Sequence, residues 1–124
     1  MKKAPIAALV VLSIILGSGV LSAQNSIVGS INQWFENKQY TYVIGIMTDD
    51  VKCTILGRDY NSKTEASRAI NDTFRGKTIE RYQLIHSGDK GNSTFMVAKI
   101  KFQDAEYRIN ILLSDNKIIE FRME

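Results

Sequence analysis

The sequence predicts an α+β domain in which N-terminal helices pack on a curved, mainly antiparallel sheet. Its 124 residues suit a single domain, because domains usually contain about 100 to 200 residues. Apolar residues in the first part of the chain recur at helical spacing, whereas from Thr78 onward they alternate with polar residues, as in strands. Turn-forming segments divide that second part into four runs, which predicts a four-stranded meander at the end of the sheet.

The first 23 residues have the features of a secretory signal peptide. A cationic start, Lys2-Lys3, precedes the apolar run 6–16, and a small-residue segment, 21–23, follows it. A membrane anchor is the alternative, but an anchor needs about 20 consecutive apolar residues, and this run has 11. We therefore expect cleavage after Ala23, export to the periplasm or the extracellular space, and a mature domain of residues 24–124 without a membrane span.

Removal of this leader leaves a nearly neutral domain. The whole chain has 16 Lys and Arg against 13 Asp and Glu, and the loss of Lys2 and Lys3 reduces the basic count to 14. Nucleic-acid binding needs clustered cations, so no nucleic-acid partner is expected. Cys53 is the only cysteine, which excludes an intramolecular disulfide. Its alternating setting, 51–55, favours a small buried side chain on a strand.

Three segments of the mature chain are interpreted as helices. Ile27, Ile31, Trp34 and Phe35 form one apolar helical stripe. Segment 40–47 has the β-branched and aromatic composition of a strand, but Asp49-Asp50 interrupts it before the strand-like run 51–56. We predict a short helix there.

The third helix has clear start and stop signals. Ser62 and Glu65 have the spacing of a capping box, in which each side chain satisfies a backbone N–H near the other residue. An apolar stripe follows, and Gly76 is placed to end the helix. The stripe consists of Ala66, Ala69, Ile70 and Phe74.

The faces of the four final strands predict how they pair. Tyr82, Leu84 and His86 share a face of the first strand. A slip of one residue would turn an apolar set outward, so we expect Phe102 opposite Tyr107 and Leu113 opposite Ile119. These pairings also set Ile100 against Ile109, Ala98 against Ile111, Met96 against Leu113, Ile111 against Phe121 and Ile109 against Met123. The opposite face carries Lys99, Lys101, Arg108, Arg122, Glu120 and Glu124 and is interpreted as solvated.

This order of elements resembles the nuclear transport factor 2-like cone of the cystatin-like group. More closely, the chain is similar to small exported bacterial proteins of a domain of unknown function, family 4783, from about Ile27 to the C-terminus. The resemblance implies a helix near residues 40–47 and no established active site. The segments that carry it are 34–38, 51–55, 60–63, 84–88, 107–109 and 118–124.

The residue inventory makes several chemistries improbable. His86 is the only histidine, and no Gly-x-Ser-x-Gly elbow is present for a serine nucleophile. One Cys and one His, 33 positions apart, do not suit a zinc site, which takes three or four ligands at short spacing. No glycine-rich phosphate loop is found. We therefore expect neither a metal nor a cofactor.

The cone itself is where the resemblance implies a pocket, between the concave sheet and the helices. Isomerases and cyclases of this shape place an Asp or His there to move a proton. His86 is the catalytic candidate, because imidazole titrates near neutrality, and Asp49 or Asp50 would orient it. The pocket candidates are His86, Tyr60, Tyr107 and Trp34.

Three functions remain open at this level. The favoured one is a non-catalytic exported module that binds a small apolar ligand or an envelope protein. The first alternative is an isomerase-, dehydratase- or cyclase-type enzyme with His86 as the proton carrier. The second alternative is a structural module that forms a homodimer through the outer face of the sheet or the helix edges. A catalytic site needs a proton carrier or nucleophile together with a partner group that activates or orients it. The sequence supplies only the first of these, His86, so the binding module is preferred.

Overall fold

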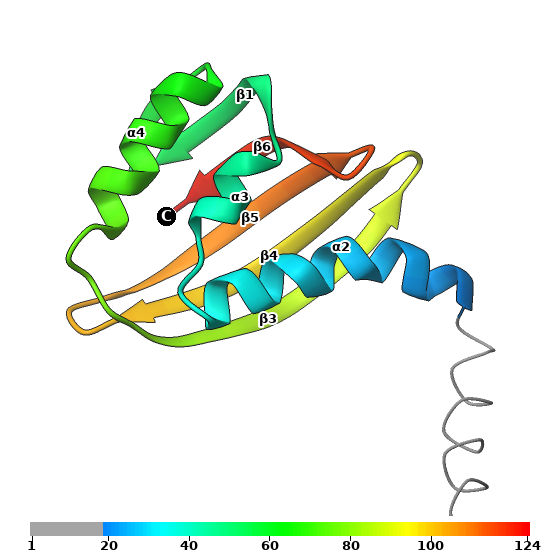
Figure 1. The fold of residues 1–124 in the computed structure, drawn as a ribbon, viewed down its shortest axis with the longest axis horizontal. Coiled ribbons are helices and arrows are strands. Elements are labelled where there is room, and N and C mark those ends of the chain that lie inside the picture. The colour runs from blue at the N-terminus through cyan, green and yellow to red at the C-terminus, as the bar shows by residue number, and fades with distance from the viewer. Residues whose placement is uncertain (1–18) are drawn as a thin grey trace, which may run out of the picture.

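The computed structural model describes the backbone of residues 19–124 and the side chains of residues 27–124. The predicted signal peptide falls mainly on residues 1–18, which lie outside the described residues. The elements follow one another as helices α2 and α3, strands β1 and β2, helix α4 and then four strands (Figure 1). Their bounds are α2 Gly19–Glu36, α3 Thr41–Gly45, β1 Met47–Ile55, β2 Arg58–Tyr60, α4 Lys63–Phe74, β3 Ile79–Lys90, β4 Ser93–Phe102, β5 Glu106–Ser114 and β6 Lys117–Met123.

The strands form one six-stranded sheet in the order β2-β1-β6-β5-β4-β3. All neighbours are antiparallel except β1 and β6, which are parallel. The three helices cover the same face of this curved sheet, with α2 along β3 and β4 and α4 beside β1 (Figure 1). The predicted α+β architecture is therefore confirmed, and the last four strands form the expected meander.

The predicted helices are confirmed, including the ambiguous segment 40–47, where α3 forms. In α4, the Ser62 hydroxyl accepts the backbone N–H of Glu65 at 3.1 Å. The Glu65 carboxylate accepts the N–H of Asn61 at 3.2 Å, one residue before the position that a regular capping box uses. Gly76 has φ +73°, a conformation that glycine adopts at low cost at the end of a helix.

Two details around β1 differ from the prediction. Asp49 and Asp50 do not separate segment 40–47 from the strand that follows. They lie inside β1, and both side chains are exposed. The short strand β2 was not expected. Leu56 and Gly57, with φ of +51° and +89°, make the two-residue turn that folds β2 back on β1. Positive φ at both central residues is typical of the tight turns that fit the twist of a hairpin.

The predicted pairing of β4 with β5 is wrong by two residues. Tyr107 lies opposite Ile100 instead of Phe102, so Ile109 faces Ala98, Ile111 faces Met96 and Leu113 faces Thr94. A shift of two keeps every side chain on its face, so alternation alone could not distinguish the two registers. The connection 103–105 is tighter than assumed, because Phe102 donates its N–H to the carbonyl of Ala105 at 2.8 Å.

The pairing of β5 with β6 is confirmed for Ile109 with Met123 and for Ile111 with Phe121. At the turn the prediction is wrong, because Leu113 lies opposite Ile118 and not Ile119. A bulge between Leu112 and Leu113 shifts the register there, and Ile118 becomes the fully buried residue. Ile119 is only half-buried.

A second bulge, in β3, shows that the predicted face of His86 is wrong. Leu84 lies opposite Ala98, but His86 lies opposite Val97, so Ile85 is the extra residue between them. An odd insertion changes the face on which the following residues lie. His86 therefore lies on the outer face with Val97, not on the apolar face with Tyr82 and Leu84, and its side chain is exposed.

Aromatic side chains fill the space between the helices and the inner face of the sheet. Phe35 of α2 stacks on Tyr82 with ring centroids 5.0 Å apart. Phe74 of α4 meets Phe102 edge-on at 5.3 Å and Tyr40 at 4.8 Å. Such pairs add to the stability gained by burial. Among residues 27–124, every buried side chain belongs to this largely apolar core.

Candidate binding surface

The four pocket candidates lie in separate surroundings. Trp34 is half-buried on α2, with its ring 5.6 Å from that of Tyr42. Tyr107 is half-buried on β5 against Phe102, at 6.0 Å. Tyr60 is half-buried on the edge strand β2, and the exposed ring of His86 lies 5.2 Å from that of Phe95. No ring contact joins these four candidates to one another in the part of the chain with described side chains.

The expected partnership of His86 with Asp49 or Asp50 is wrong on topological grounds. His86 is on β3 at one edge of the sheet, whereas both aspartates are on β1. Strands β6, β5 and β4 lie between them. A carboxylate orients an imidazole only within hydrogen-bond reach, and three intervening strands place these groups beyond it.

The outer face of the sheet carries an apolar patch that none of the helices in the described residues covers. It consists of Phe95 and Val97 on β4 and Leu112 on β5, all half-buried and on alternate positions of adjacent strands. Phe95 lies directly opposite Leu112, and Val97 opposite Asn110. We call these three residues the outer patch. The alternation of β4 and β5 could have revealed it, because residues 95, 97 and 112 break the otherwise polar pattern of that face.

The position of the Phe95 ring is fixed by its neighbours. Gly88 lies opposite Phe95 in the β3–β4 pair, and a Cβ atom at Gly88 would come within 3.0 Å of two carbons of the ring. The ring therefore occupies the space that a side chain at residue 88 would fill. The His86 ring, which the Ile85 bulge turns outward on the same strand as Gly88, lies 5.2 Å from the Phe95 ring. An aromatic ring that covers a glycine on the neighbouring strand helps to fix the register of the two strands.

Two hollows lie side by side on this outer face. The first, of about 240 Å³, is bordered by the outer patch, and the second, of about 310 Å³, is on β1, β2 and β6. Glu120 lines both hollows and lies in register between Leu112 of β5 and Lys52 of β1. The first is lined by Phe95, Met96, Val97, Asn110, Ile111, Leu112 and Glu120, and the second by Lys52, Cys53, Thr54, Asp59, Asn61, Glu120 and Arg122.

In the second hollow, some of the charged side chains have a partner and one does not. The Asp59 carboxylate accepts the hydroxyl of Thr54 at 2.8 Å. Glu120 lies 3.9 Å from the Arg122 guanidinium. Lys52 has an exposed side chain, and no carboxylate among residues 27–124 forms an ion pair with it. The first hollow thus borders the apolar outer patch, whereas the second combines two cations, Lys52 and Arg122, with two carboxylates, Asp59 and Glu120.

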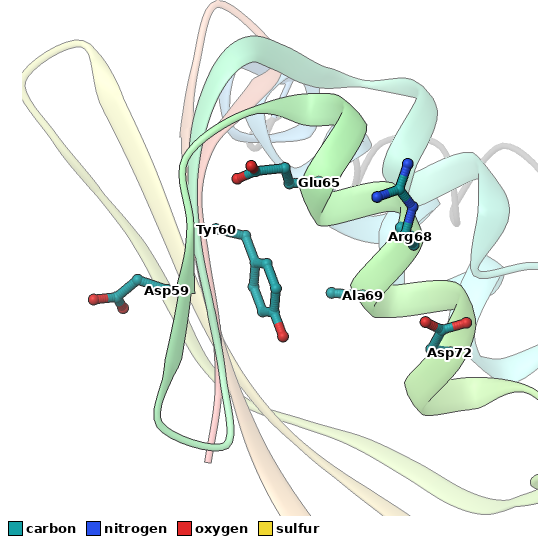
Figure 2. Close-up of a pocket in the computed structure, with 6 residues that line it drawn as sticks. All are labelled: Asp59, Tyr60, Glu65, Arg68, Ala69 and Asp72. Atoms are coloured by element: carbon teal, nitrogen blue, oxygen red, sulfur yellow. The ribbon is translucent and has the colours of Figure 1, made fainter.

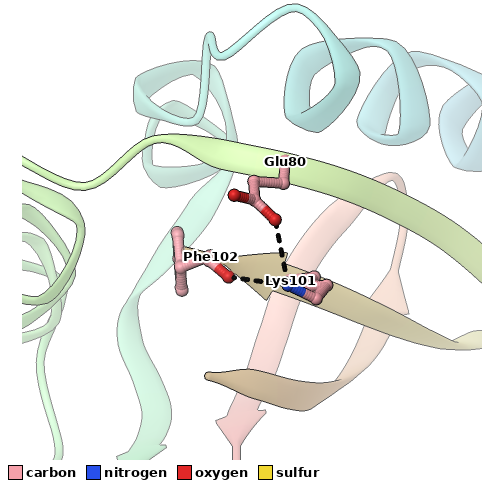
Figure 3. Close-up of polar contacts among 3 residues, drawn as sticks. All are labelled: Glu80, Lys101 and Phe102. Atoms are coloured by element: carbon pink, nitrogen blue, oxygen red, sulfur yellow. Dashed lines mark hydrogen bonds and ion pairs between the residues drawn. The ribbon is translucent and has the colours of Figure 1, made fainter. Parts of the chain in front are cut away.

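Further along the outer face, charged side chains neutralise one another. Lys101 donates to the Glu80 carboxylate at 2.9 Å and lies 3.5 Å from the carbonyl oxygen of Phe102 (Figure 3). Both ionic side chains are more than one-third exposed, so this pair contributes little to stability. It does remove Lys101 from the cations that are free to meet a ligand.

A third hollow, of about 350 Å³, lies between β2 and α4. Tyr60 projects toward Ala69 and Asp72 of α4, whereas Asp59 projects to the opposite side of the strand (Figure 2). Glu65 at its rim is already engaged in capping α4, and Asp72 pairs with Arg75 at 3.6 Å. Glu65 and Asp72 therefore have roles in the fold, whereas Arg68 and the Tyr60 hydroxyl also line this hollow.

Two side chains facing the core have shifted pKa values. Burial raises the pKa of the Cys53 thiol to about 11, so the thiol stays protonated at neutral pH. Burial, and secondarily the charge of Glu36, also raises the pKa of Tyr82. The Tyr82 hydroxyl donates to the Asn32 side-chain oxygen at 2.7 Å. Both shifts keep the group neutral and are those of structural residues.

Two further searches were confined to the described part of the chain. No group of three or more His, Cys, Asp or Glu side chains there is arranged to hold a metal ion. None of the helices in that part is long and apolar enough to cross a membrane.

Comparison with known proteins places the chain among structural relatives. The family model "Domain of unknown function (DUF4783)" matches residues 28–123. A DUF4783 family protein from Bacteroides ovatus is 21% identical with a TM-score of 0.67, over 75% of this chain and 89% of that one. Another from Bacteroides uniformis is 17% identical with a TM-score of 0.67, over 76% and 92%.

Other folds of this type are more distant. A putative polyketide cyclase from Sinorhizobium meliloti is 11% identical with a TM-score of 0.63, over 80% of this chain and 94% of that one. At these identities the likeness shows the fold alone. No curated protein matches the sequence. Since the family model spans most of the chain, the protein belongs to the DUF4783 family and has the nuclear transport factor 2-like fold.

Proposed function

We propose that the protein is a non-catalytic, exported binding module that holds a protein partner on the outer face of its sheet. The observation that carries the proposal is the outer patch, Phe95, Val97 and Leu112, which none of the described helices covers although the opposite face is packed under three helices. Rigid aromatic side chains beside a hollow are typical anchors of protein interfaces. The Phe95 ring lies over Gly88 and 5.2 Å from the His86 ring.

The two alternatives have less support. A small apolar ligand inside the cone would have to displace the aromatic cluster around Phe35, Tyr82 and Phe74. An enzyme of the isomerase or cyclase type would need its proton carrier in an enclosed pocket, whereas His86 is exposed on the outer face. The likeness to a putative polyketide cyclase extends to the fold and carries no residue-level role for this chain.

Export is part of this proposal. The leader features of residues 1–23 support it, and the match to the family model starts only at residue 28. A cut after Ala23 falls inside α2 but precedes Val28, the first buried residue of the core. The mature chain would thus keep every core residue, and its partner would belong to the cell envelope or the extracellular space.

A pair of charge-matched variants tests the surface. Leu112→Asp places a carboxylate in the outer patch, and Gln83→Asp adds the same charge at an exposed position of β3 outside both hollows. We expect a protein that co-purifies from the producing cells with wild type and Gln83→Asp but not with Leu112→Asp. Equal recovery with all three proteins would contradict the proposal. Sedimentation of the purified protein adds a second arm, in which a dimer abolished by Leu112→Asp would favour the homodimer alternative.

A further inference from the structure

We infer that Leu56, at the tip of the β1–β2 hairpin, inserts into an apolar pocket of a protein partner. The hairpin is at the edge of the sheet opposite to β3, and strand β6 lies between β1 and β5. Binding at this tip therefore does not depend on the outer patch, which is on β4 and β5. The backbone conformation of Leu56, its exposure and the shape of the turn support this role.

The backbone conformation of Leu56 is one that leucine adopts only at a cost in free energy. Its φ is +51°, in the left-handed region that glycine and asparagine enter readily and a bulky side chain does not. The turn has two residues, between Ile55 and Arg58, and Gly57 has φ +89°. Such turns favour Asn-Gly and Asp-Gly, so folding alone would not select leucine at residue 56.

The turn between β5 and β6 has a similar conformation but a different sequence. Asp115 and Asn116 have φ of +53° and +61°, and the flanking pair is Ser114 with Lys117. Asp and Asn tolerate this conformation because their short polar side chains can bond to the local backbone. Leu56 is the one apolar residue among the non-glycine residues with positive φ in the described part of the chain. Residues that break a local rule in this way are candidates for function.

The side chain of Leu56 is also held away from the core. It is 52% exposed, as one of three large apolar side chains that are exposed among residues 27–124. Its backbone N–H donates to the carbonyl oxygen of Met123 at 2.9 Å, which ties the turn to the end of β6. An exposed leucine in a turn tied down in this way gains free energy only when a partner removes it from water.

The size and shape of this apolar surface favour a pocket in another protein. Ile55 is buried, and residues 57–59 carry no apolar side chain, so the turn presents a single leucine. Leu56 lines none of the three hollows described above, and a projecting tip cannot enclose a small molecule, whose sites are concave. One aliphatic side chain is also too little to hold a protein on a membrane, since even a single myristoyl chain binds only marginally.

Two substitutions at residue 56 separate the cost in stability from the contact with the partner. Leu56→Asn removes the apolar side chain and suits positive φ, whereas Leu56→Gln removes the apolar surface without suiting that conformation. We expect Leu56→Asn to raise the midpoint of urea unfolding, Leu56→Gln to leave it nearly unchanged, and both variants to lose the partner. Asp115→Leu, the reciprocal change in the β5–β6 turn, should lower the midpoint and retain the partner.

A photoreactive residue at exposed position 58, beside the tip, captures the partner in the producing cells. We expect an adduct with a protein other than this chain, and its loss when Leu56→Asn or Leu56→Gln is added. The partner, identified in the adduct by mass spectrometry, is then produced and titrated with the purified proteins. Both variants at residue 56 should weaken binding at least about tenfold, and Asp115→Leu should leave affinity within about twofold.

Several results would overturn this inference. They are an adduct that persists in both variants, an adduct with a second copy of the chain, no adduct from position 58, and a midpoint for Leu56→Asn below that of wild type. Crosslinking from position 112 distinguishes this site from the proposed function. An adduct from position 112 without one from position 58 would overturn the hairpin site and leave the proposed function intact. The reverse result would support the hairpin site and contradict the outer patch.

Discussion

The aromatic ring of Phe95 lies over Gly88 across the β3–β4 pair, so closely that a methyl group at residue 88 would be 3.0 Å from the ring. This relationship fixes an apolar ring on the face of the sheet that the helices leave open. The Ile85 bulge adds the ring of His86 to the same face. Phe95 is therefore the residue of the outer patch with ring and backbone neighbours from β3.

Gly88→Ala should displace the Phe95 ring. The contact at 3.0 Å forces the ring to move, and we expect a loss of stability of about 1 kcal/mol together with weaker partner binding. Gly29→Ala is the control, because a Cβ there meets nothing within 4 Å and alanine favours the interior of α2. Urea unfolding measures both free energies. A Gly88→Ala protein as stable as wild type would show that the ring position is not constrained.

Tyr82→Phe should remove one partly buried hydrogen bond and keep the ring stack on Phe35. The Tyr82 hydroxyl donates to Asn32 at 2.7 Å, and loss of such a bond costs about 1 kcal/mol. Tyr42→Phe, at a side chain that is 55% exposed, should cost close to nothing. If thermal unfolding gave the same stability change for both variants, the bond to Asn32 would have no energetic role.

Cys53 should make the protein less stable in alkali. Its pKa is near 9 when unfolded and about 11 in the native state, so unfolding releases a proton between these values. The unfolded state then binds fewer protons, and stability falls as pH rises from about 9 to 11, by roughly 2 to 3 kcal/mol in total. Below pH 9 the contribution of Cys53 to the free energy of unfolding does not change with pH. Cys53→Ala should lower the stability at pH 7, because the core loses volume, but it should flatten the alkaline decline.

Tyr82 contributes to the alkaline decline in both proteins, so the difference in slope isolates the thiol. Parallel slopes in urea titrations at pH 8 to 11 would mean that the thiol is not protected. Alkylation with iodoacetamide at pH 7 gives an independent check, because the protonated, buried thiol should react only after unfolding.

Ser62→Ala should destabilise α4 at its first turn. The Ser62 hydroxyl accepts the N–H of Glu65 at 3.1 Å, and loss of an N-cap costs about 0.5 to 2 kcal/mol. Ser67→Ala, in the interior of the same helix, should be neutral or slightly stabilising. The free energies of unfolding of the two variants distinguish loss of the Ser62 cap from a general destabilisation of α4 by alanine.

The mature form should begin at Gln24. Mass spectrometry of the protein recovered from the cell envelope or the medium checks this expectation directly. Retention of residues 1–23 in the exported form would point instead to an anchor, and a protein found only inside the cell would remove the export proposal.

The sequence predicted the architecture well because periodicity reports burial. The stripe of α4 and the inner face of the meander follow from the spacing of apolar residues, whereas the helix at 41–45 was predicted against its strand-like composition. The error in the pairing of β4 with β5 has a simple physical origin. Alternation fixes the face of a side chain but not a two-residue register shift, as between Tyr107 and Ile100.

The candidate site was less predictable, since bulges are not visible in composition. The extra residue Ile85 turned His86 from the expected concave face to the outer face, and the bulge near Leu113 made Ile118 the buried residue. Lys52, Leu112 and Phe95 lie on three different strands, and only the strand order and register bring them into one row on the outer face. The order of the strands in the sheet, and not a sequence motif, brings the residues of this surface together.

Site-specific photo-crosslinking in the producing cells tests the central claim most directly. A photoreactive residue at position 112 lies in the outer patch, and one at exposed Arg75, at the end of α4, is the control. We predict that position 112 forms an adduct with one distinct envelope or extracellular protein and that position 75 does not. An adduct from position 75 alone, or none from either position, would contradict a partner on the outer face of the sheet.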